Sequence, residues 1–183
     1  MLSVRGGVSM AIIRQVNQGS VQLLSGLVGL LQDVVHHGAS VGFLAPLEQA
    51  EANRYWQGVL ADLGRGLVLW VAEQDGIVVG AIQLALCGRA NGMHRADVQK
   101  LFVHSLSRGI GISSQLLYAL EAFAKQQRRS LLVLDTEAGS LAEKIYQHWN
   151  WQRVGEIPGY AASPDGKLIS TCYYYKQVAL EDD

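Results

Sequence analysis

The chain has 183 residues, and 49% of them are hydrophobic, which is enough to bury one sizeable core. Its 15 basic and 16 acidic residues leave a net charge of −1, which excludes the general basic surface of a nucleic-acid-binding protein. A membrane span is also excluded, because no run reaches about 18 consecutive apolar residues. We therefore expect a single domain over residues 11–180, behind a short disordered extension of residues 1–10.

Neither a leader nor a metal site is expected. Residues 1–10 lack the long hydrophobic region of a secretory signal, so we expect a cytoplasmic protein. The two cysteines, Cys87 and Cys172, lie far apart and predict buried free thiols instead of a metal-binding pair. The five histidines form neither a His-x-x-x-His nor a His-Glu-x-x-His cluster, which excludes the common zinc motifs.

The N-terminal part of the chain predicts one strand and two helices. Residues 12–16 predict a short strand. Apolar residues then recur at helical spacing after Ser20, a good N-cap residue, and predict a helix that ends near Gly38. A second helix is expected over residues 46–63, because it starts with a proline and two glycines follow its end.

The central part predicts a hairpin, a strand and a helix. Residues 67–73 and 77–86 flank an Asp-Gly turn and predict a β-hairpin. Residues 96–103 predict the next strand. A polar loop with glycines follows, and then an amphipathic helix whose last turns carry positive charge, which complements the helix dipole.

The C-terminal part predicts a buried strand, a helix and two final strands. Residues 130–134 are apolar and indicate burial on both faces of a sheet. Ser140 precedes Glu143 by three residues, which is a capping box for a helix to about Trp149. Strands over residues 151–156 and 170–177 complete the sheet, and a long connection is expected between them.

The glycine-containing loop is the strongest functional signal. Gly109 and Gly111 stand between a strand and a helix, where the backbone can approach a phosphate and helix N–H groups are unpaired, and Arg108 adds charge. A P-loop is excluded because no Gly-Lys-Ser/Thr follows. A dinucleotide site nearly fits, with Asp135 at roughly the expected distance of about 20 residues. However, Ser114 replaces its third glycine, and a polar loop separates the strand from the first.

Residues 106–111, Leu-Ser-Arg-Gly-Ile-Gly, resemble the acyl-coenzyme A loop of the GNAT acetyltransferases, which reads Arg/Gln-x-x-Gly-x-Gly/Ala, except that Leu106 takes the first position. The similarity spans about residues 12–176. Five further segments resemble the tabtoxin-resistance branch of this family: residues 37–43, 98–101, 134–140, 153–160 and 163–167. The resemblance implies an α/β (α+β) chain with the GNAT acyl-CoA N-acyltransferase fold, in which helices flank a mixed, mostly antiparallel central sheet.

The resemblance also implies that acetyl-CoA is the cofactor. Backbone N–H groups of the loop would hold its pyrophosphate, and the backbone of the preceding strand would pair with its pantetheine arm and supply an oxyanion donor, while the side chains of that strand pack in the core. The cofactor-binding residues expected on this basis are Leu101, Phe102, Val103, Arg108, Gly109, Ile110, Gly111, Ile112, Ser113 and Ser114.

Three residues are candidates for catalysis. Tyr146 falls where the family carries a tyrosine near the cofactor sulfur, so it would give a proton to the leaving thiolate. On the sequence alone, Tyr146 also suits plain packing on an amphipathic helix. Asp135 and Asp97 are candidates for the base that deprotonates the amine, and Asp135 also for a substrate anchor. A helix cap or a hydrogen bond to a loop is the alternative role for either aspartate.

We expect an N-acetyltransferase whose acceptor is the primary amine of a small molecule, which attacks directly. The tabtoxin-resistance resemblance implies detoxification of an amino-acid toxin. The alternatives are acetylation of a protein or peptide N-terminus and, because Leu106 departs from the motif, a non-catalytic acyl-CoA sensor. The expected partners include neither a nucleic acid nor a membrane, and the expected assembly is a monomer or homodimer.

Overall fold

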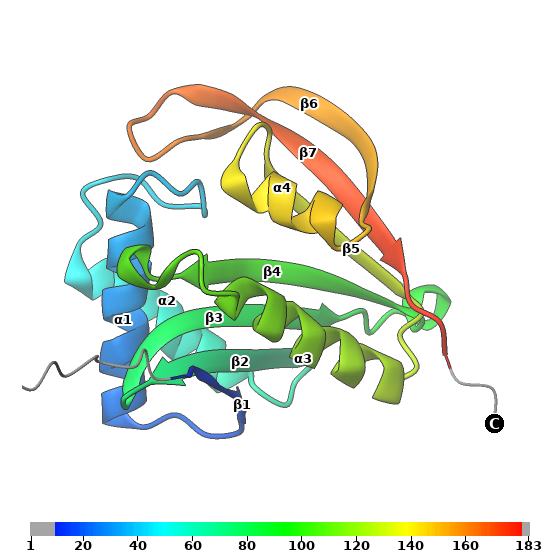
Figure 1. Cartoon of the computed structure of the whole chain (residues 1–183), viewed down its shortest axis with the longest axis horizontal. Helices are drawn as coiled ribbons and strands as arrows, with labels where there is room; N and C mark the ends of the chain where they lie inside the picture. The colour runs from blue at the N-terminus through cyan, green and yellow to red at the C-terminus, as the bar shows by residue number, and fades with distance from the viewer. Residues whose placement is uncertain (1–9, 181–183) are drawn as a thin grey trace, which may run out of the picture.

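The computed structural model describes residues 10–180, so the predicted extension lies outside the described residues except for Met10. Seven strands form one sheet in the order β1-β2-β3-β4-β5-β7-β6 (Figure 1). Within the described residues, β4 and β5 are parallel and every other neighbouring pair is antiparallel, which confirms the mixed, mostly antiparallel sheet. The elements are β1 (Ile12–Val16), α1 (Val21–His36), α2 (Gln49–Asp62), β2 (Leu67–Gln74), β3 (Ile77–Leu86), β4 (Arg95–Val103), α3 (Ile112–Gln126), β5 (Leu131–Glu137), α4 (Leu141–His148), β6 (Gln152–Ala162) and β7 (Leu168–Gln177), with short 3-10 turns at Ala90–Gly92 and Ser105–Ser107.

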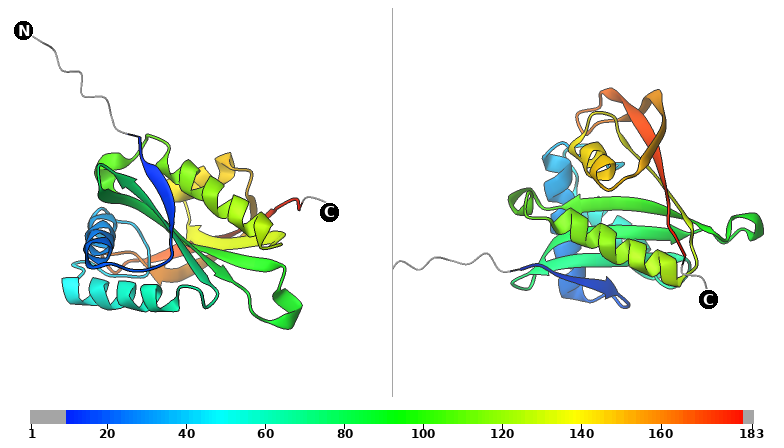
Figure 2. Two further views of the ribbon diagram at one scale, coloured as in Figure 1. Left: turned by 90° about the horizontal axis from the view of Figure 1, so that it is seen from below. Right: turned by 45° about the vertical axis from the view of Figure 1, so that its right-hand side comes forward.

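Helices cover both faces of the sheet (Figure 2). On one face α1 and α2 pack against the sheet around Leu27, Leu31 and Trp56, which are fully buried. On the other face α3 and α4 pack around Leu116 and Leu120. Each such side chain stabilises the fold by about 1.5–3 kcal/mol through burial. None of the helices in the described part is long and apolar enough to cross a membrane.

Most predicted elements are confirmed, and their local signals form as expected. The Ser20 hydroxyl accepts a hydrogen bond from the N–H of Leu23 at 3.1 Å and caps α1. Ser140 caps α4 in the same way, through the N–H of Glu143 at 3.2 Å. The carboxylate of Glu143 completes the capping box one residue earlier than expected, because it accepts from the N–H of Gly139 at 2.6 Å.

The predicted start of the second helix is wrong. Helix α2 begins at Gln49, three residues after Pro46. The chain is still extended at Glu48, because Leu47 turns inward: its side chain is buried, and its carbonyl oxygen accepts a hydrogen bond from Gln32 on α1 at 3.0 Å. These contacts make residues 46–48 part of the loop that joins the two helices.

The extents of the last strands are also corrected. Strand β6 continues to Ala162, so most of the expected long connection belongs to a hairpin with β7. Pro158 is accommodated because β6 is the edge strand of the sheet and an edge residue needs no second ladder partner. Strand β5 continues to Glu137 through its pairing with β7. Asp135 therefore lies within β5 instead of at its end.

Candidate active site

The two parallel strands β4 and β5 pair over three residues and then separate. Their paired residues are 95–97 and 131–133, and β5 continues toward Glu137 with β7 as its neighbour. From residue 98 to 103, β4 pairs with β3, and its other edge has no strand partner in the part of the chain that the structure describes (Figure 1). An open strand edge carries N–H and C=O groups that can pair with an extended chain of amides. The pantetheine arm of a coenzyme A is such a chain.

A β-bulge in β4 lies where the two strands separate. The register with β3 shifts there, so that Ile82 faces two residues of β4, Lys100 and Leu101. Lys100 takes a positive φ of 54°, which is unusual for a residue with a side chain. The extra residue reverses the alternation of faces: Val98 packs under α3, whereas Phe102 packs under α1 and α2. The bulge therefore turns Lys100 out of the regular strand pattern.

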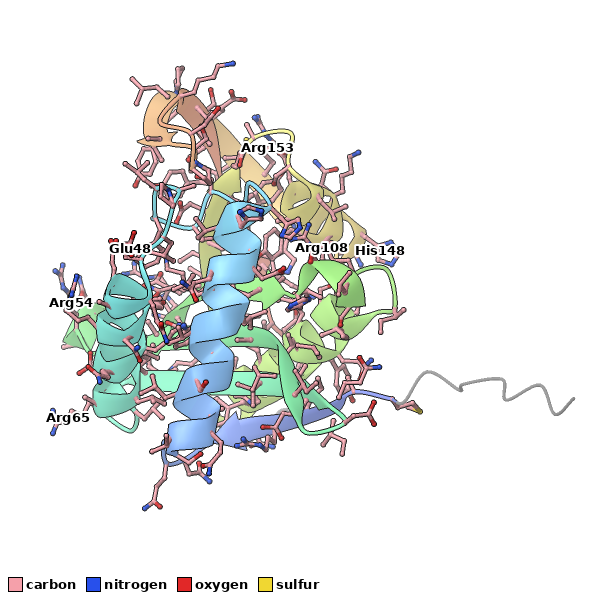
Figure 3. All side chains as sticks on the ribbon, turned by 90° about the vertical axis from the view of Figure 1, so that its left-hand side faces the viewer. Glu48, Arg54, Arg65, Arg108, His148 and Arg153 are labelled. Carbon is pink, nitrogen blue, oxygen red and sulfur yellow. The ribbon has the colours of Figure 1, made fainter. Side chains whose placement is uncertain are left out.

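The loop predicted to bind an anion lies at the start of α3. Gly109 and Gly111 both take left-handed conformations, with φ of 79° and 84°. A Cβ atom at either glycine would meet no atom within 4 Å, so the space in front of the loop is open. Gly111 is the N-cap of α3 and no side chain caps it, which leaves N–H groups of the first turn available to a phosphate. The exposed side chain of Arg108 lies beside the C-terminal end of α1 (Figure 3).

Asp33, on α1, ties this loop to the rest of the molecule. Its carboxylate accepts hydrogen bonds from the backbone N–H of Ser105 at 2.7 Å and from the Ser105 hydroxyl at 2.8 Å. Burial alone would raise the pKa of Asp33, but these bonds and the nearby rings of His104 and His37 outweigh burial and lower it. Sequence reasoning missed Asp33, since nothing in its neighbourhood marks a contact 72 residues away.

The loop of residues 37–48 covers the site on the face of the sheet where α1 and α2 pack. The Lys100 ammonium donates a hydrogen bond to the carbonyl oxygen of Val41 at 2.6 Å. The N–H of Ala45 donates to the carbonyl oxygen of Pro164, in the turn between β6 and β7, at 2.8 Å. The backbone of Ser40 bonds the carboxylate of Glu137; burial and the charge of Asp165 nevertheless raise the pKa of Glu137. The loop thus bonds to β4, to β5 and to the β6–β7 turn.

The charge of Asp135 acts on Tyr146, and no recorded interaction links Asp97 to either of them among the described residues. Burial first, and then the charge of Asp135, raise the pKa of Tyr146, so this phenol is protonated at neutral pH. Tyr146 also packs edge-to-face on Trp151, with ring centroids 5.7 Å apart. A packing role for the Tyr146 ring is therefore compatible with a catalytic role for its hydroxyl. Asp97 lies at the last paired position of β4, where β5 is still its neighbour.

Asp135 has two further neighbours across the site. It is paired with Tyr173 of β7, whose hydroxyl donates to that of Tyr160 at 2.8 Å. The hydrogen bond to Tyr160 and burial raise the pKa of Tyr173 to about 12, and the charge of Asp135 adds to this shift. The charge of Asp135 also raises the pKa of Lys100, which lies on the other strand of the opening between β4 and β5. Among residues 10–180, no group of three or more His, Cys, Asp or Glu side chains could hold a metal ion.

Comparisons with known proteins agree with this geometry. Residues 42–160 match the family described as acetyltransferase (GNAT) domain. A relative from Azospirillum brasilense, described as an uncharacterized N-acetyltransferase in the hisH-hisA intergenic region, is 32% identical over 114 residues, which are 61% of this chain and 67% of that protein.

Solved structures share the fold at low sequence identity. An N-acetyltransferase from Staphylococcus aureus Mu50 superposes with a TM-score of 0.76 at 21% identity, over 93% of this chain and 100% of that one. A putative acetyltransferase from Salmonella typhimurium with acetyl-CoA gives 0.74 at 15% identity, over 95% and 97%. A phosphinothricin acetyltransferase from Sinorhizobium meliloti with acetyl-CoA gives 0.74 at 16% identity, over 93% and 89%.

The open edge of β4 and the left-handed glycine loop fit two adjoining parts of an acetyl-CoA molecule, its amide-bearing arm and its pyrophosphate. The family match covers well over half of the chain, and the curated relative is similar over two thirds of its own length. The chain therefore belongs to the acetyltransferase (GNAT) family and is an acetyl-CoA-dependent N-acetyltransferase.

Proposed function

We propose that the protein acetylates the primary amine of a small molecule, which attacks directly without a covalent intermediate on the enzyme. The observation that carries this proposal is that residues 37–48 cover the side of the site where the acceptor would bind. Residues 37–48 bond to β4, to Glu137 and to the β6–β7 turn, and so close the face on which a protein substrate would need an open groove. A small amine needs only a pocket.

Residues of the loop and of β4 would hold the cofactor. The N–H groups of residues 108–113 would bind the pyrophosphate, and Arg108 would add a charge at the surface. The backbone of residues 101–103 would pair with the pantetheine arm, while the side chains of Leu101, Phe102 and Val103 pack on both faces of the sheet. When bound, acetyl-CoA supplies an acetyl group on a good leaving group.

The chain's own side chains would then move two protons. Asp135 is exposed on β5 and would accept a proton from the incoming ammonium or hold that ammonium at the site. Asp97 is the second candidate for the base, at the closed end of the opening. Tyr146 is kept protonated by burial and by Asp135, and would donate its proton to the departing sulfur.

The resemblance to the tabtoxin-resistance branch supports an amino-acid toxin as the acceptor, and two of the similar solved structures are named phosphinothricin acetyltransferases. Fold similarity alone does not fix the acceptor. A cytoplasmic location, a single domain, and a monomeric or homodimeric assembly stay predictions from the sequence.

The experiment is free-thiol release from acetyl-CoA against a panel of primary amines, amino-acid analogues and short peptides, with cofactor binding followed by calorimetry. Release that depends on a small amine is the expected result. Release with peptides alone would favour the N-terminal acetyltransferase. Binding without release on any acceptor would favour the sensor, and absence of binding would refute the cofactor site at Gly109 and Gly111.

A further inference from the structure

Lys100 is a partly buried cation that forms no ion pair with any described residue. Burial lowers the pKa of this ammonium, and the charge of Asp135 partly opposes that effect. An ammonium carries three N–H donors. Within residues 10–180 the structure records one acceptor for them, the carbonyl oxygen of Val41, and no ion pair. A charge that is partly withdrawn from water is stabilised by an opposite charge, so this arrangement leaves room for an anion from outside the chain.

The backbone is arranged to hold Lys100 in this place. Its positive φ in the bulge is a conformation that costs free energy for any residue with a side chain, and such strain gathers at functional sites. Gly42 leaves space beside the ammonium, because a Cβ atom there would lie 3.2 Å from the Lys100 nitrogen. The bond to Val41 then fixes the charge under the covering loop.

Lys100 and Asp135 form two opposite poles of the acceptor site. They come from β4 and β5, the strands that separate, and the charge of Asp135 raises the pKa of Lys100, although the two side chains form no ion pair. A molecule between them would meet a positive group on one side and a negative group on the other. A small zwitterion, whose ammonium and carboxylate are a few bonds apart, satisfies both.

We infer that Lys100 binds the carboxylate of the acceptor while Asp135 receives its ammonium, so that the enzyme selects amines that also carry a carboxylate. This inference rests on the proposed function, because it concerns the acceptor of that reaction. Lys100 is then a specificity-determining residue, and the acceptors are amino acids or similar zwitterions.

The first test compares each common L-amino acid with its carboxamide in the thiol-release assay. The two members of a pair differ in charge and share the amine and the side chain. For the best acceptors we expect kcat/KM to be about tenfold or more higher for the acid than for its carboxamide. The reason is that the acid gains a charge-assisted hydrogen bond in a partly desolvated site. The preference should disappear in Lys100→Met, which keeps the apolar stem, and persist in part in Lys100→Arg. Lys125→Met, at the exposed end of α3, is the matched control and should keep it.

The second test measures anion binding without turnover. Propionate and propionamide have the same shape and differ in charge. In an NMR titration of the protein with labelled lysines, propionate should shift the Lys100 side-chain signal along a saturable curve, and propionamide should not. The Lys125 signal should stay in place. Lys100→Arg removes the labelled lysine and so assigns its signal, and the titration itself uses the unmodified protein, so it also decides the question if Lys100→Met does not fold.

The outcomes separate the inference from the function on which it rests. Acid preference that depends on Lys100, together with the propionate shift, supports the inference. Amine acetylation with no acid preference and no propionate shift overturns it and leaves the transferase intact. If no amine is acetylated, the proposed function falls, and the propionate titration alone decides whether Lys100 is an anion site.

Discussion

Replacing Asp33 with asparagine tests whether the loop that leads to Gly109 and Gly111 is held in place by α1. The side chain of Asp33 is 13% exposed and accepts two hydrogen bonds from Ser105, at 2.7 and 2.8 Å. Asparagine keeps the shape and one acceptor oxygen but turns the other contact into an N–H group. The Ser105 hydroxyl can accept from that N–H group, so both contacts can persist, but they lose the charge of the carboxylate, which costs about 1.5 kcal/mol because hydrogen bonds to charged groups are roughly twice as strong as neutral ones.

This energy sets the size of the effect on cofactor binding. If all of it serves to order the loop, the affinity for coenzyme A falls by about tenfold, since 1.4 kcal/mol corresponds to one factor of ten. Calorimetry of coenzyme A binding and urea unfolding would measure the two effects side by side. Asp62→Asn, an exposed carboxylate at the end of α2, is the control and should change neither quantity.

The pH dependence gives a second check with a definite sign. Because the pKa of Asp33 is lowered in the folded state, its contribution to the free energy of unfolding is present above the unfolded value of about 3.9. The contribution is lost as the pH falls through the folded pKa. His37 and His104 face the same carboxylate, at 3.2 and 3.6 Å. The stability difference between Asp33→Asn and the unmodified protein should therefore be seen at pH 7 and vanish at strongly acidic pH. Equal affinity and equal stability at pH 7 would refute the proposed anchoring.

Three further substitutions test other parts of the site. Tyr146→Phe should slow thiol release by about 100-fold, the lower range for loss of a general acid, with coenzyme A affinity retained in calorimetry; an unchanged rate would remove the hydroxyl from the mechanism. Gly111→Val should weaken coenzyme A binding, because its φ of 84° costs a side-chain-bearing residue about 1–3 kcal/mol; normal affinity in a folded variant would place the phosphate site elsewhere. Gly80→Ala should lower the free energy of unfolding by about 1–3 kcal/mol through overpacking, because its Cβ would lie 2.9 Å from Ile112 at the start of α3; an unchanged urea midpoint would show that α3 adjusts freely.

The parts of the fold that the sequence predicted correctly have local signals. Gly109 and Gly111 indicate a left-handed loop before a helix, because a residue without a Cβ atom adopts that conformation easily. This property belongs to each residue alone. The capping serines Ser20 and Ser140 act within three residues of their own positions. Such features need no knowledge of distant contacts, and the structure places them as expected.

The parts that were missed depend on which distant residues meet. Asp33 is recognisable as an anchor only when α1 lies beside Ser105, and the fold determines that contact. The bulge at Lys100 depends on the register between β3 and β4, which cannot be read from the residue pattern of one strand. One signal was present: Gln99 and Lys100 are two consecutive polar residues in a mostly apolar strand, residues 98–103, and so break the alternation of polar and apolar residues. The strand β6 was cut short because Pro158 suggests a break unless the strand is known to be at an edge.

The bulge at Lys100 affects both the strand edge that would bind the cofactor and the side of the site that would bind the acceptor. Because one residue is inserted, Phe102 packs under α1 and α2 while Leu101 and Val103 pack toward α3. Side chains on both faces therefore fix the backbone of residues 101–103, although its edge toward β5 is open, and a fixed edge loses little entropy when an amide chain pairs with it. The same insertion points Lys100 toward Val41 and the acceptor side. The proposed position of the cofactor and the charge that would select the acceptor thus depend on one irregularity in β4, and a change in the register of this strand should disturb both at once.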